Sequence, residues 1–462
     1  MVTNLKTSIL PSSHTYARID RPHELNLKAI CIFVAIGFFL DDDTYWKDKV
    51  CLKPGHSHAF DEKGFLLKSS PDFEWFYEPE PRSFSDVLDQ YKSLLHAIIT
   101  EQITNSPVIL PLSGGLDSRS LAMVLGSLDN PVQAFSYEFE NGFAETDIAK
   151  QVAKACDFQF DAFKIETGYL WKCIGDLAKL NGCCSEFTHP RQMAVLSQMK
   201  QMQGVYCLGH WGDVLFDRGV PEGTKEQDLL PLFLKKLPKP SGMELAGMLW
   251  NVWGLEGNFK DYFTSRIEDA LSRIHIDNAS AKARAFKTIH WAHRWTTTNL
   301  QVFQSAHPMV LPYYDDRMIE FICKVPETYL ADRRLQIAHL QEEPKLAKIV
   351  WQRHRPFNLT NFNFNSMPYN LPYRIVSKLH REVKGALGKP HVQRNWELQF
   401  LGKQNDRLLN HYLLNPKFLT WIPESLVTDV YKQFKQQSTI QQSHAISMLL
   451  TLSLWCQTHR DS

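Results

Sequence analysis

The stretch from Pro107 to Gly126, PVILPLSGGLDSRSLAMVLG, predicts a strand, a tight loop and a helix in immediate succession. Val108 to Leu112 has the length and branching of a buried strand, and apolar residues recur at helical spacing from Leu116 onward. The loop therefore opens a helix N-terminus, where first-turn N–H groups and the helix dipole favour an anion. Gly114 and Gly115 lack the Cβ atoms that would keep a phosphate away from the backbone.

Three polar side chains give this loop its chemical character. Ser113 and Ser118 add hydroxyl donors beside the glycines. Asp117 is unexpected, because a carboxylate repels a phosphate unless a hard cation such as Mg²⁺ lies between them. A glycine-rich turn without a ligand would account for the glycines but not for Asp117. Since the loop lacks the lysine of a Walker A motif, it predicts a metal-bound nucleotide on a different kind of phosphate loop.

The segments around the loop alternate between strand-like and helical patterns. An amphipathic helical pattern covers Ser83 to Ile103, just before the loop. The stretches that follow the loop are Val132 to Phe135 (strand), Glu145 to Cys156 (helix), Phe158 to Ile165 (strand) and Val205 to Leu208 (strand). This order predicts an α/β fold with a parallel, doubly wound sheet that binds ligands at the carboxyl ends of its strands. From about residue 230 onward the pattern is mostly helical.

A second glycine-framed turn, Gly209-His-Trp-Gly-Asp213, follows the strand-like run Val205 to Leu208. It carries a second aspartate, Asp213, at the carboxyl end of a predicted strand. An ordinary strand-to-helix turn would also produce the glycines. Two such turns at one edge of a sheet are nevertheless placed to share one nucleotide.

The charge balance and the cysteines exclude several classes of protein. With 51 basic and 50 acidic residues the chain has no net field that favours nucleic acid or a membrane surface. The nine cysteines include no Cys-x-x-Cys, which argues against a zinc site and suits a reducing compartment. The most apolar run, Ala29 to Leu40, is too short to span a bilayer. We therefore expect a soluble, cytoplasmic protein without nucleic-acid or membrane partners.

The loop LSGGLDSR resembles the pyrophosphate-binding loop of the ATP pyrophosphatases and, in this form, the synthase domain of asparagine synthetase-like proteins. The segment from Gly209 to Phe216 resembles a second signature of that family. The resemblance implies a sheet of the adenine nucleotide α-hydrolase type, with ATP and with Mg²⁺ held by Asp117 and Asp213. The residues implied for ATP contact are Leu112, Ser113, Gly114, Gly115, Asp117, Ser118, Phe135, Ser136, Leu208 and Gly209.

The chemistry that the resemblance implies is ATP-dependent amide formation. A carboxylate attacks the α-phosphate of ATP, pyrophosphate leaves, and an amine or ammonia captures the acyl adenylate. Metal and backbone donors would stabilise the charge on the leaving pyrophosphate. The partners implied are therefore a small-molecule or peptide carboxylate and a nitrogen nucleophile.

Residues 1–82 form a predicted small β-rich piece, with a hairpin near Asp61 to Gly64, ahead of a synthase domain at 83–462. The piece resembles the last part of the glutaminase domain of asparagine synthetases. The front of that domain is absent, and Val2 stands where the family has its cysteine nucleophile. We expect a truncated, inactive remnant that does not hydrolyse glutamine.

Three departures separate the chain from a plain asparagine synthetase. His210 stands where the family has a glutamate in the second signature, and an imidazole does not replace an acidic group. Pro308 and Val310 replace a charged pair ahead of a later motif. Arg353, His354 and Arg355 stand where the family has a mobile-loop lysine, and an arginine supplies charge with a different geometry. The predicted catalytic residues are accordingly His210, Arg353 and Arg355.

The substrate stays open between alternatives. The turn Gly-His-x-Gly-Asp resembles that of lasso-peptide cyclases, which close a macrolactam on a precursor peptide. Aspartate with free ammonia and a specialised amide or macrolactam are therefore both candidate reactions, the latter with a precursor peptide or partner protein. A third alternative is a degenerate homologue that binds ATP without turnover.

A basic amphipathic helix is predicted from Tyr373 to Leu387, after an asparagine-rich loop from Asn358 to Asn370. Its charges fit either a plain solvated face or an anionic or peptide partner.

Overall fold

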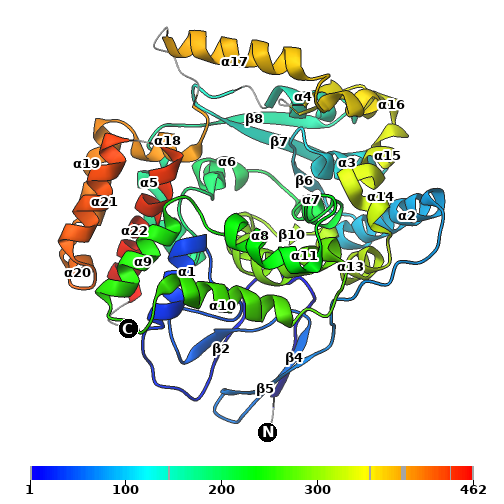
Figure 1. The fold of residues 1–462 in the computed structure, drawn as a ribbon. Coiled ribbons are helices and arrows are strands. Elements are labelled where there is room, and N and C mark those ends of the chain that lie inside the picture. Colours follow the sequence, from blue (N-terminus) through cyan, green and yellow to red (C-terminus); the bar gives the residue numbers. More distant parts are fainter. Residues whose placement is uncertain (1–2, 144–145, 353–354, 387–391, 438, 460–462) are drawn as a thin grey trace.

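The computed structural model describes residues 3–143, 146–352, 355–386, 392–437 and 439–459 (Figure 1). A five-stranded parallel sheet with the order β10-β9-β6-β7-β8 lies at its centre. The strands are β6 (Val108–Pro111), β7 (Val132–Phe139), β8 (Gln159–Ile165), β9 (Val205–Cys207) and β10 (Met309–Val310). The predicted α/β fold with a doubly wound parallel sheet is confirmed, and the phosphate loop leaves the carboxyl end of the central strand β6.

The helices next to the sheet agree with the sequence pattern to within a few residues. They are α2 (Phe84–Ile103), α3 (Leu116–Leu125) and α4 (Thr146–Ala155), and a further helix, α5 (Tyr169–Asn181), was not predicted. Ser83 caps α2, where its Oγ accepts the Asp86 N–H at 3.2 Å. Strand β7 is longer than predicted, because it pairs with β8 from Gln133 through Phe139. Glu145, where the second helix was predicted to start, lies outside the described residues.

Small antiparallel sheets occupy the N-terminal region, below the main body in Figure 1. One sheet has the order β1-β4-β5, from β1 (Thr3–Lys6), β4 (His56–Phe60) and β5 (Leu66–Pro71), and the other pairs β2 (Tyr16–Arg18) with β3 (Lys49–Cys51). The predicted hairpin joins β4 to β5, where Asp61 Oδ1 accepts the N–H groups of Lys63 and Phe65.

The apolar run in this β-rich region is a helix, α1 (Leu27–Ile36). All residues from Ala29 to Ile36 are buried, and periodicity alone does not separate a helix from a strand when every side is covered. The helix packs against α9 (Gly242–Val252), so closely that a Cβ on Gly242 would lie 2.3 Å from the Ala35 carbonyl oxygen. The N-terminal piece thus shares its core with the rest of the chain, while a domain boundary after residue 82 stays a prediction.

The second half of the chain is mostly helical, as predicted. Its longer helices are α8 (Leu229–Lys236), α10 (Phe259–Ser272), α11 (Ala279–Phe286), α12 (Thr297–Gln304), α13 (Asp316–Cys323), α15 (Arg334–Gln341), α17 (Leu371–Ala386), α19 (Lys403–Leu413), α21 (Glu424–Gln436) and α22 (Ile440–His459). A π-helix, Lys287–Thr296, joins α11 to α12. Within the described ranges no helix is long and apolar enough to cross a membrane.

Candidate active site

Hydrogen bonds within the phosphate loop fix its conformation without a ligand. Gly115 is the N-cap of α3, with extended backbone at φ −71° and ψ 166°. Its N–H donates to Ser113 Oγ at 3.1 Å, and the Ser113 N–H donates to Ser118 Oγ at 3.1 Å. The Leu112 N–H donates to the Phe135 carbonyl at 2.8 Å, which fixes the start of the loop to β7. The loop therefore presents a shaped helix N-terminus at the sheet edge.

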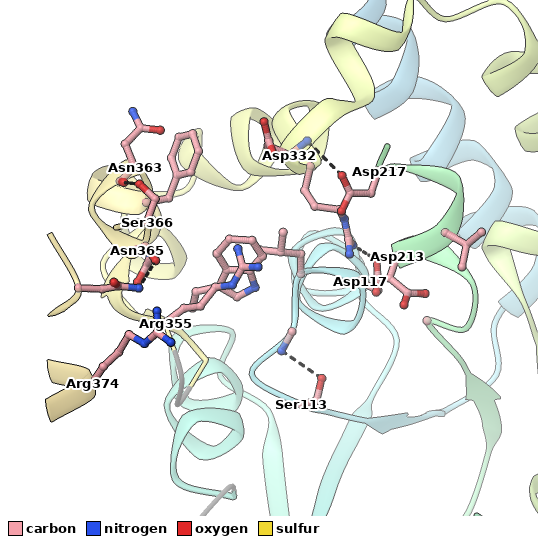
Figure 2. A pocket seen from close by; sticks show the side chains of 18 of the residues that line it. Ser113, Asp117, Asp213, Asp217, Asp332, Arg355, Asn363, Asn365, Ser366 and Arg374 are labelled. Atoms are coloured by element: carbon pink, nitrogen blue, oxygen red, sulfur yellow. Dashed lines mark hydrogen bonds and ion pairs between the residues drawn. The ribbon is translucent and has the colours of Figure 1, made fainter. Parts of the chain in front are cut away.

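The second turn packs directly onto the first, through two of its glycines. A Cβ on Gly209 would lie 3.1 Å from the Ser118 nitrogen, and a Cβ on Gly212 would lie 2.3 Å from Asp117 Oδ1. Between them, Trp211 has a positive φ of 74° and leads into the short helix α7 (Gly212–Leu215). The two predicted turns thus meet at one sheet edge, which brings Asp117 and Asp213 side by side (Figure 2).

Asp117 has two partners that come from a distant part of the chain. Its Oδ1 forms an ion pair with Arg333 and accepts the Gln336 amide at 2.9 Å. Burial raises the pKa of Asp117 to about 6, Arg333 opposes the shift, and the Asp213 carboxylate adds to it. Neither partner was predicted from the sequence, because nothing local in residues 331–341 marks a site.

The donor set fits a Mg²⁺ ion that arrives with a nucleotide. Asp117 and Asp213 supply two carboxylates, and one oxygen of Asp117 is already engaged by Arg333 and Gln336. In the described part of the chain, no group of three or more His, Cys, Asp or Glu side chains is placed to hold a metal alone. One or two carboxylates together with substrate phosphates is a common donor set for Mg²⁺. The residues therefore fit a metal shared with phosphate oxygens.

A cavity of about 1940 Å³ opens over the two turns (Figure 2). The predicted site residues that line it are Ser113, Gly115, Asp117, Gly209, His210, Asp213 and Arg355. Its other walls come from the π-helix, from Asp332 and Arg333, from Trp351, and from residues between 355 and 378. Arg353 and His354 lie outside the described residues.

Six residues implied for ATP contact do not line this cavity. They are Leu112, Gly114, Ser118, Phe135, Ser136 and Leu208. The side chains of Leu112, Phe135 and Leu208 are buried in the core, so only their backbone atoms are left to meet a nucleotide. Gly114 is packed against the side chain of Ile148, because a Cβ at this position would lie 2.8 Å from Ile148 Cγ2. A role for these positions in ATP binding stays a prediction.

His210 borders the cavity as a neutral imidazole. Burial lowers the pKa of His210 to about 4, although the nearby Asp213 carboxylate acts in the opposite direction. The ring packs edge to face on Phe303, with the centroids 5.8 Å apart. Its Nδ1 is buried and has no hydrogen-bond partner within the described residues. The imidazole therefore interacts electrostatically with Asp213 and carries no positive charge at neutral pH.

Arg119, which the sequence analysis did not single out, ties the phosphate loop to the far wall of the cavity. Its buried guanidinium donates to the Gly114 carbonyl at 3.0 Å. The other carbonyls that it reaches are those of Leu346 (3.3 Å), Ile349 (3.2 Å), Val350 (2.8 Å) and Trp351 (3.2 Å). The segment 346–351 leads to Arg355, whose guanidinium lies 4.3 Å from the ring centre of Trp351. The sequence signal that could have identified this role is the position of Arg119, a charged residue within the apolar pattern of helix α3.

The π-helix contributes a further group of residues that was not predicted from the sequence. Lys287, Trp291, Trp295 and Thr296 line the cavity from this segment. Burial lowers the pKa of Lys287, and its ammonium donates to the Gly219 carbonyl at 3.1 Å. A lysine is thus present in the cavity, although not at the place where the resemblance implies one. π-Helical turns are rare and are often found at functional sites.

A parallel sheet with an aspartate-bearing phosphate loop and a second aspartate beside it defines an ATP pyrophosphatase-type synthase domain. The chain belongs to the asparagine synthase family, whose sequence profile matches residues 90–342. The family is one of ATP-dependent carbon–nitrogen ligases. The cavity wall formed by Trp351 and by residues between 355 and 378 lies beyond the matched region.

Two solved structures are similar to parts of the chain. The NMN synthetase from Francisella tularensis is 15% identical, with 46% of this chain and 93% of that chain covered and a TM-score of 0.22. The glutamine-dependent NAD+ synthetase from Acinetobacter baumannii in complex with ADP is 13% identical, with 55% of each chain covered and a TM-score of 0.21. No curated protein matches.

Proposed function

We propose that the protein is an ATP-dependent, AMP- and pyrophosphate-forming ligase that adenylates a carboxylate and transfers the acyl group to an amine or ammonia. The observation that carries this proposal is the meeting of Asp117 and Asp213 at the N-terminus of α3. A site for an isolated anion would not place two carboxylates there, whereas a site for a metal-bound triphosphate does.

The reaction uses the loop to hold the leaving group. A carboxylate oxygen of the substrate attacks the α-phosphorus, and the bond from that phosphorus to pyrophosphate breaks. Backbone N–H groups at the start of α3 would bind the pyrophosphate, and Asp117 and Asp213 would hold Mg²⁺, which would neutralise charge on the phosphates. An amine nitrogen then attacks the acyl carbon, loses a proton, and AMP leaves.

His210 is proposed to receive a hydrogen bond from the attacking amine. An efficient general base has a pKa near the working pH, whereas the pKa of His210 is lowered to about 4. The imidazole is therefore neutral and orients the nucleophile better than it removes its proton. Arg355 is proposed to supply positive charge near the transferring phosphate, in the role that a lysine has in the relatives that the sequence resembles.

The size of the cavity favours a substrate larger than aspartate. Pockets for small molecules usually have volumes of about 300–1,000 Å³, and this cavity measures about 1940 Å³. The cavity thus has space for a nucleotide and, beside it, for a bulky second substrate. Between the two substrate classes, this observation supports a peptide or other natural-product amide, including a macrolactam, over asparagine formation.

The test of this function is ATP–pyrophosphate exchange by the full chain with a panel of amino acids and linear peptides. We expect exchange with peptide carboxylates and little with aspartate. Asp117→Asn and Asp213→Asn should each lower exchange on the order of a hundredfold or more. Asp269→Asn, an exposed aspartate on α10, is the matched control. Exchange at wild-type rates in either site variant would reject the proposed reaction.

A further inference from the structure

Exposed large apolar side chains gather on one stretch of the chain. Seven of the eleven found in the described residues lie between positions 364 and 379, namely Phe364, Met367, Tyr369, Leu371, Ile375, Val376 and Leu379. Val376 is 65% exposed and Tyr369 is 59% exposed. Single exposed apolar residues are ordinary, but a cluster of this kind marks an interaction surface. The stretch ends in α17, which lies at the periphery of the molecule, at the top of Figure 1.

The same helix forms part of the cavity wall. The residues of this helix that line the cavity are Leu371, Tyr373, Arg374, Ile375, Ser377 and Lys378. Among them Leu371, Arg374, Ile375 and Lys378 share one helix face, because they are spaced three and four residues apart. On one side of this face, Ile375 is followed around the helix by Leu379 and then by Val376. Arg374 and Lys378 lie on the opposite side of the same face. The apolar stripe is therefore continuous with the cavity and is bordered by positive charge.

The positive charges at this end of the cavity lack strong acidic partners. Figure 2 shows Arg355 and Arg374 reaching toward the same part of the cavity, from β12 (Arg355–Asn358) and α17. Among the residues that the structure describes, no carboxylate forms an ion pair with either guanidinium. Lys378 meets Glu382 only at 3.8 Å, and both side chains are exposed, so this pair contributes little. The surface is ready to accept an anionic group.

We propose that this surface, formed by residues 364–379, docks an acidic and apolar segment of a peptide substrate. The inference rests on the proposed ligase function, and it names the substrate class and the place of its recognition. Acidic side chains would face Arg374 and Lys378, and apolar side chains would cover Ile375, Val376 and Leu379. The reacting carboxylate would then enter the cavity toward the phosphate loop.

A basic amphipathic helix also fits an anionic lipid surface. The arrangement favours a peptide, because Arg374, Ile375 and Lys378 face into a cavity that contains the phosphate loop. The two occupants are distinguished by direct binding.

The test measures binding by the full chain without ATP, so that its outcome does not depend on turnover. The probes are fluorescent peptides of about 12 residues that combine Glu with Leu, and the same peptides with Gln for Glu or Ser for Leu. We expect the Glu–Leu peptides to bind, both altered sets to bind roughly tenfold more weakly, and salt to weaken the Glu-dependent part. Failure of the wild type to prefer Glu–Leu peptides overturns the proposal.

Two double variants locate the surface. Arg374→Gln with Lys378→Gln should weaken peptide binding roughly tenfold, and Val376→Ser with Leu379→Ser should do the same. Lys403→Gln with Arg407→Gln removes two exposed charges at the same spacing on α19 and is the matched control. Equal affinity in the α17 variants and the control would overturn the proposal.

Two further outcomes of these measurements would overturn the proposal and assign the surface to another occupant. Binding of the wild type to vesicles of phosphatidylserine and phosphatidylcholine, lost in the α17 variants, together with no peptide binding, would assign the surface to a membrane. Dimers in sedimentation that dissociate in the Val376→Ser, Leu379→Ser variant would assign it to a second copy of the chain. If exchange activity is absent while peptide binding behaves as expected, the ligase function fails and the docking surface stands.

Discussion

Gly212 carries the tightest steric demand at the site, because its α-hydrogen faces the carboxylate of Asp117. A Cβ at this position would lie 2.3 Å from Asp117 Oδ1 and 2.7 Å from its Cγ. Any side chain would push the carboxylate away from Arg333 and Gln336 or shift the second turn. The close approach of the two turns thus depends on one missing methyl group.

We predict that Gly212→Ala lowers ATP–pyrophosphate exchange by at least about a hundredfold, because it displaces the proposed metal ligand. The fold should lose about 1–3 kcal/mol, which urea unfolding measures. Gly247→Ala is the control, because Gly247 lies within α9 and a methyl group there would have no neighbour within 4 Å. Alanine at that position should stabilise the helix by about 0.5–1 kcal/mol. Similar exchange rates in the two variants would show that the turns tolerate the extra atom.

His210 leads to a prediction about pH and proton transfer. Since burial lowers its pKa to about 4, its charge does not change between pH 5 and 8, and it should add no ionisation to the rate profile in that range. His210→Ala should reduce turnover about tenfold through the lost hydrogen bond, and His210→Glu should not restore it. Amide formation, followed as AMP release with carboxylate and amine both present, that is unaffected by His210→Ala would make this residue a structural part of the turn.

At the scale of elements, the sequence predicted the features that depend on neighbouring residues. It did not predict the contacts between residues far apart in the chain. The strand, loop and helix around Asp117 were predicted within about a residue, because apolar spacing and glycines are local signals. The helix α1 within the β-rich piece was not, because its run is buried on every side. Arg333 and Gln336 were missed for a related reason, since they reach Asp117 across more than 200 residues of chain.

Arg119 shows how one element positions another. Its guanidinium holds the carbonyl of Gly114 and four carbonyls of the segment 346–351. We predict that Arg119→Lys destabilises the fold by about 2–4 kcal/mol, because a single ammonium cannot reach all five acceptors. Hydrogen exchange in residues 346–351 should rise more than in β7 and β8. Uniform protection in the variant would mean that the segment is held by other contacts.

At the scale of the whole molecule, several buried histidines link stability to pH. Outside the second turn, burial lowers the pKa of His14 (to about 3), His290 (to about 4), His339 (to about 4) and His444 (to about 4). In the unfolded chain each regains a pKa near 6.5. Between these values the unfolded state binds more protons than the folded state, so the folded state is favoured above about pH 6.5 and loses stability as the pH falls toward 4.

Two buried carboxyl groups act in the opposite sense over part of this range. Burial raises the pKa of Asp43 to about 6 against the opposing charge of Arg266, and it raises the pKa of Asp117 to about 6 against that of Arg333. Their contribution is present at low pH and is lost as the pH rises through 6. Burial also lowers the pKa of His293, so these two carboxyl groups oppose five buried imidazoles outside the second turn. The histidines therefore decide the sign, and the net stability should fall on acidification.

His444 allows this expectation to be tested one residue at a time. Its Nε2 donates to the Val34 carbonyl at 2.9 Å, and so connects α22 to α1 in the shared core. We predict that the free energy of unfolding of the wild type, from urea titrations, decreases between pH 6.5 and pH 4. Each histidine contributes up to about 1.4 kcal/mol per pH unit. His444→Gln retains an N–H donor but does not titrate in this range, so its stability should depend less steeply on pH by about one proton.

His411→Gln, at an exposed position on α19, is the control and should leave the slope unchanged. Equal slopes in all three proteins would mean that His444 is not the neutral, buried group on which the packing of α22 against α1 depends.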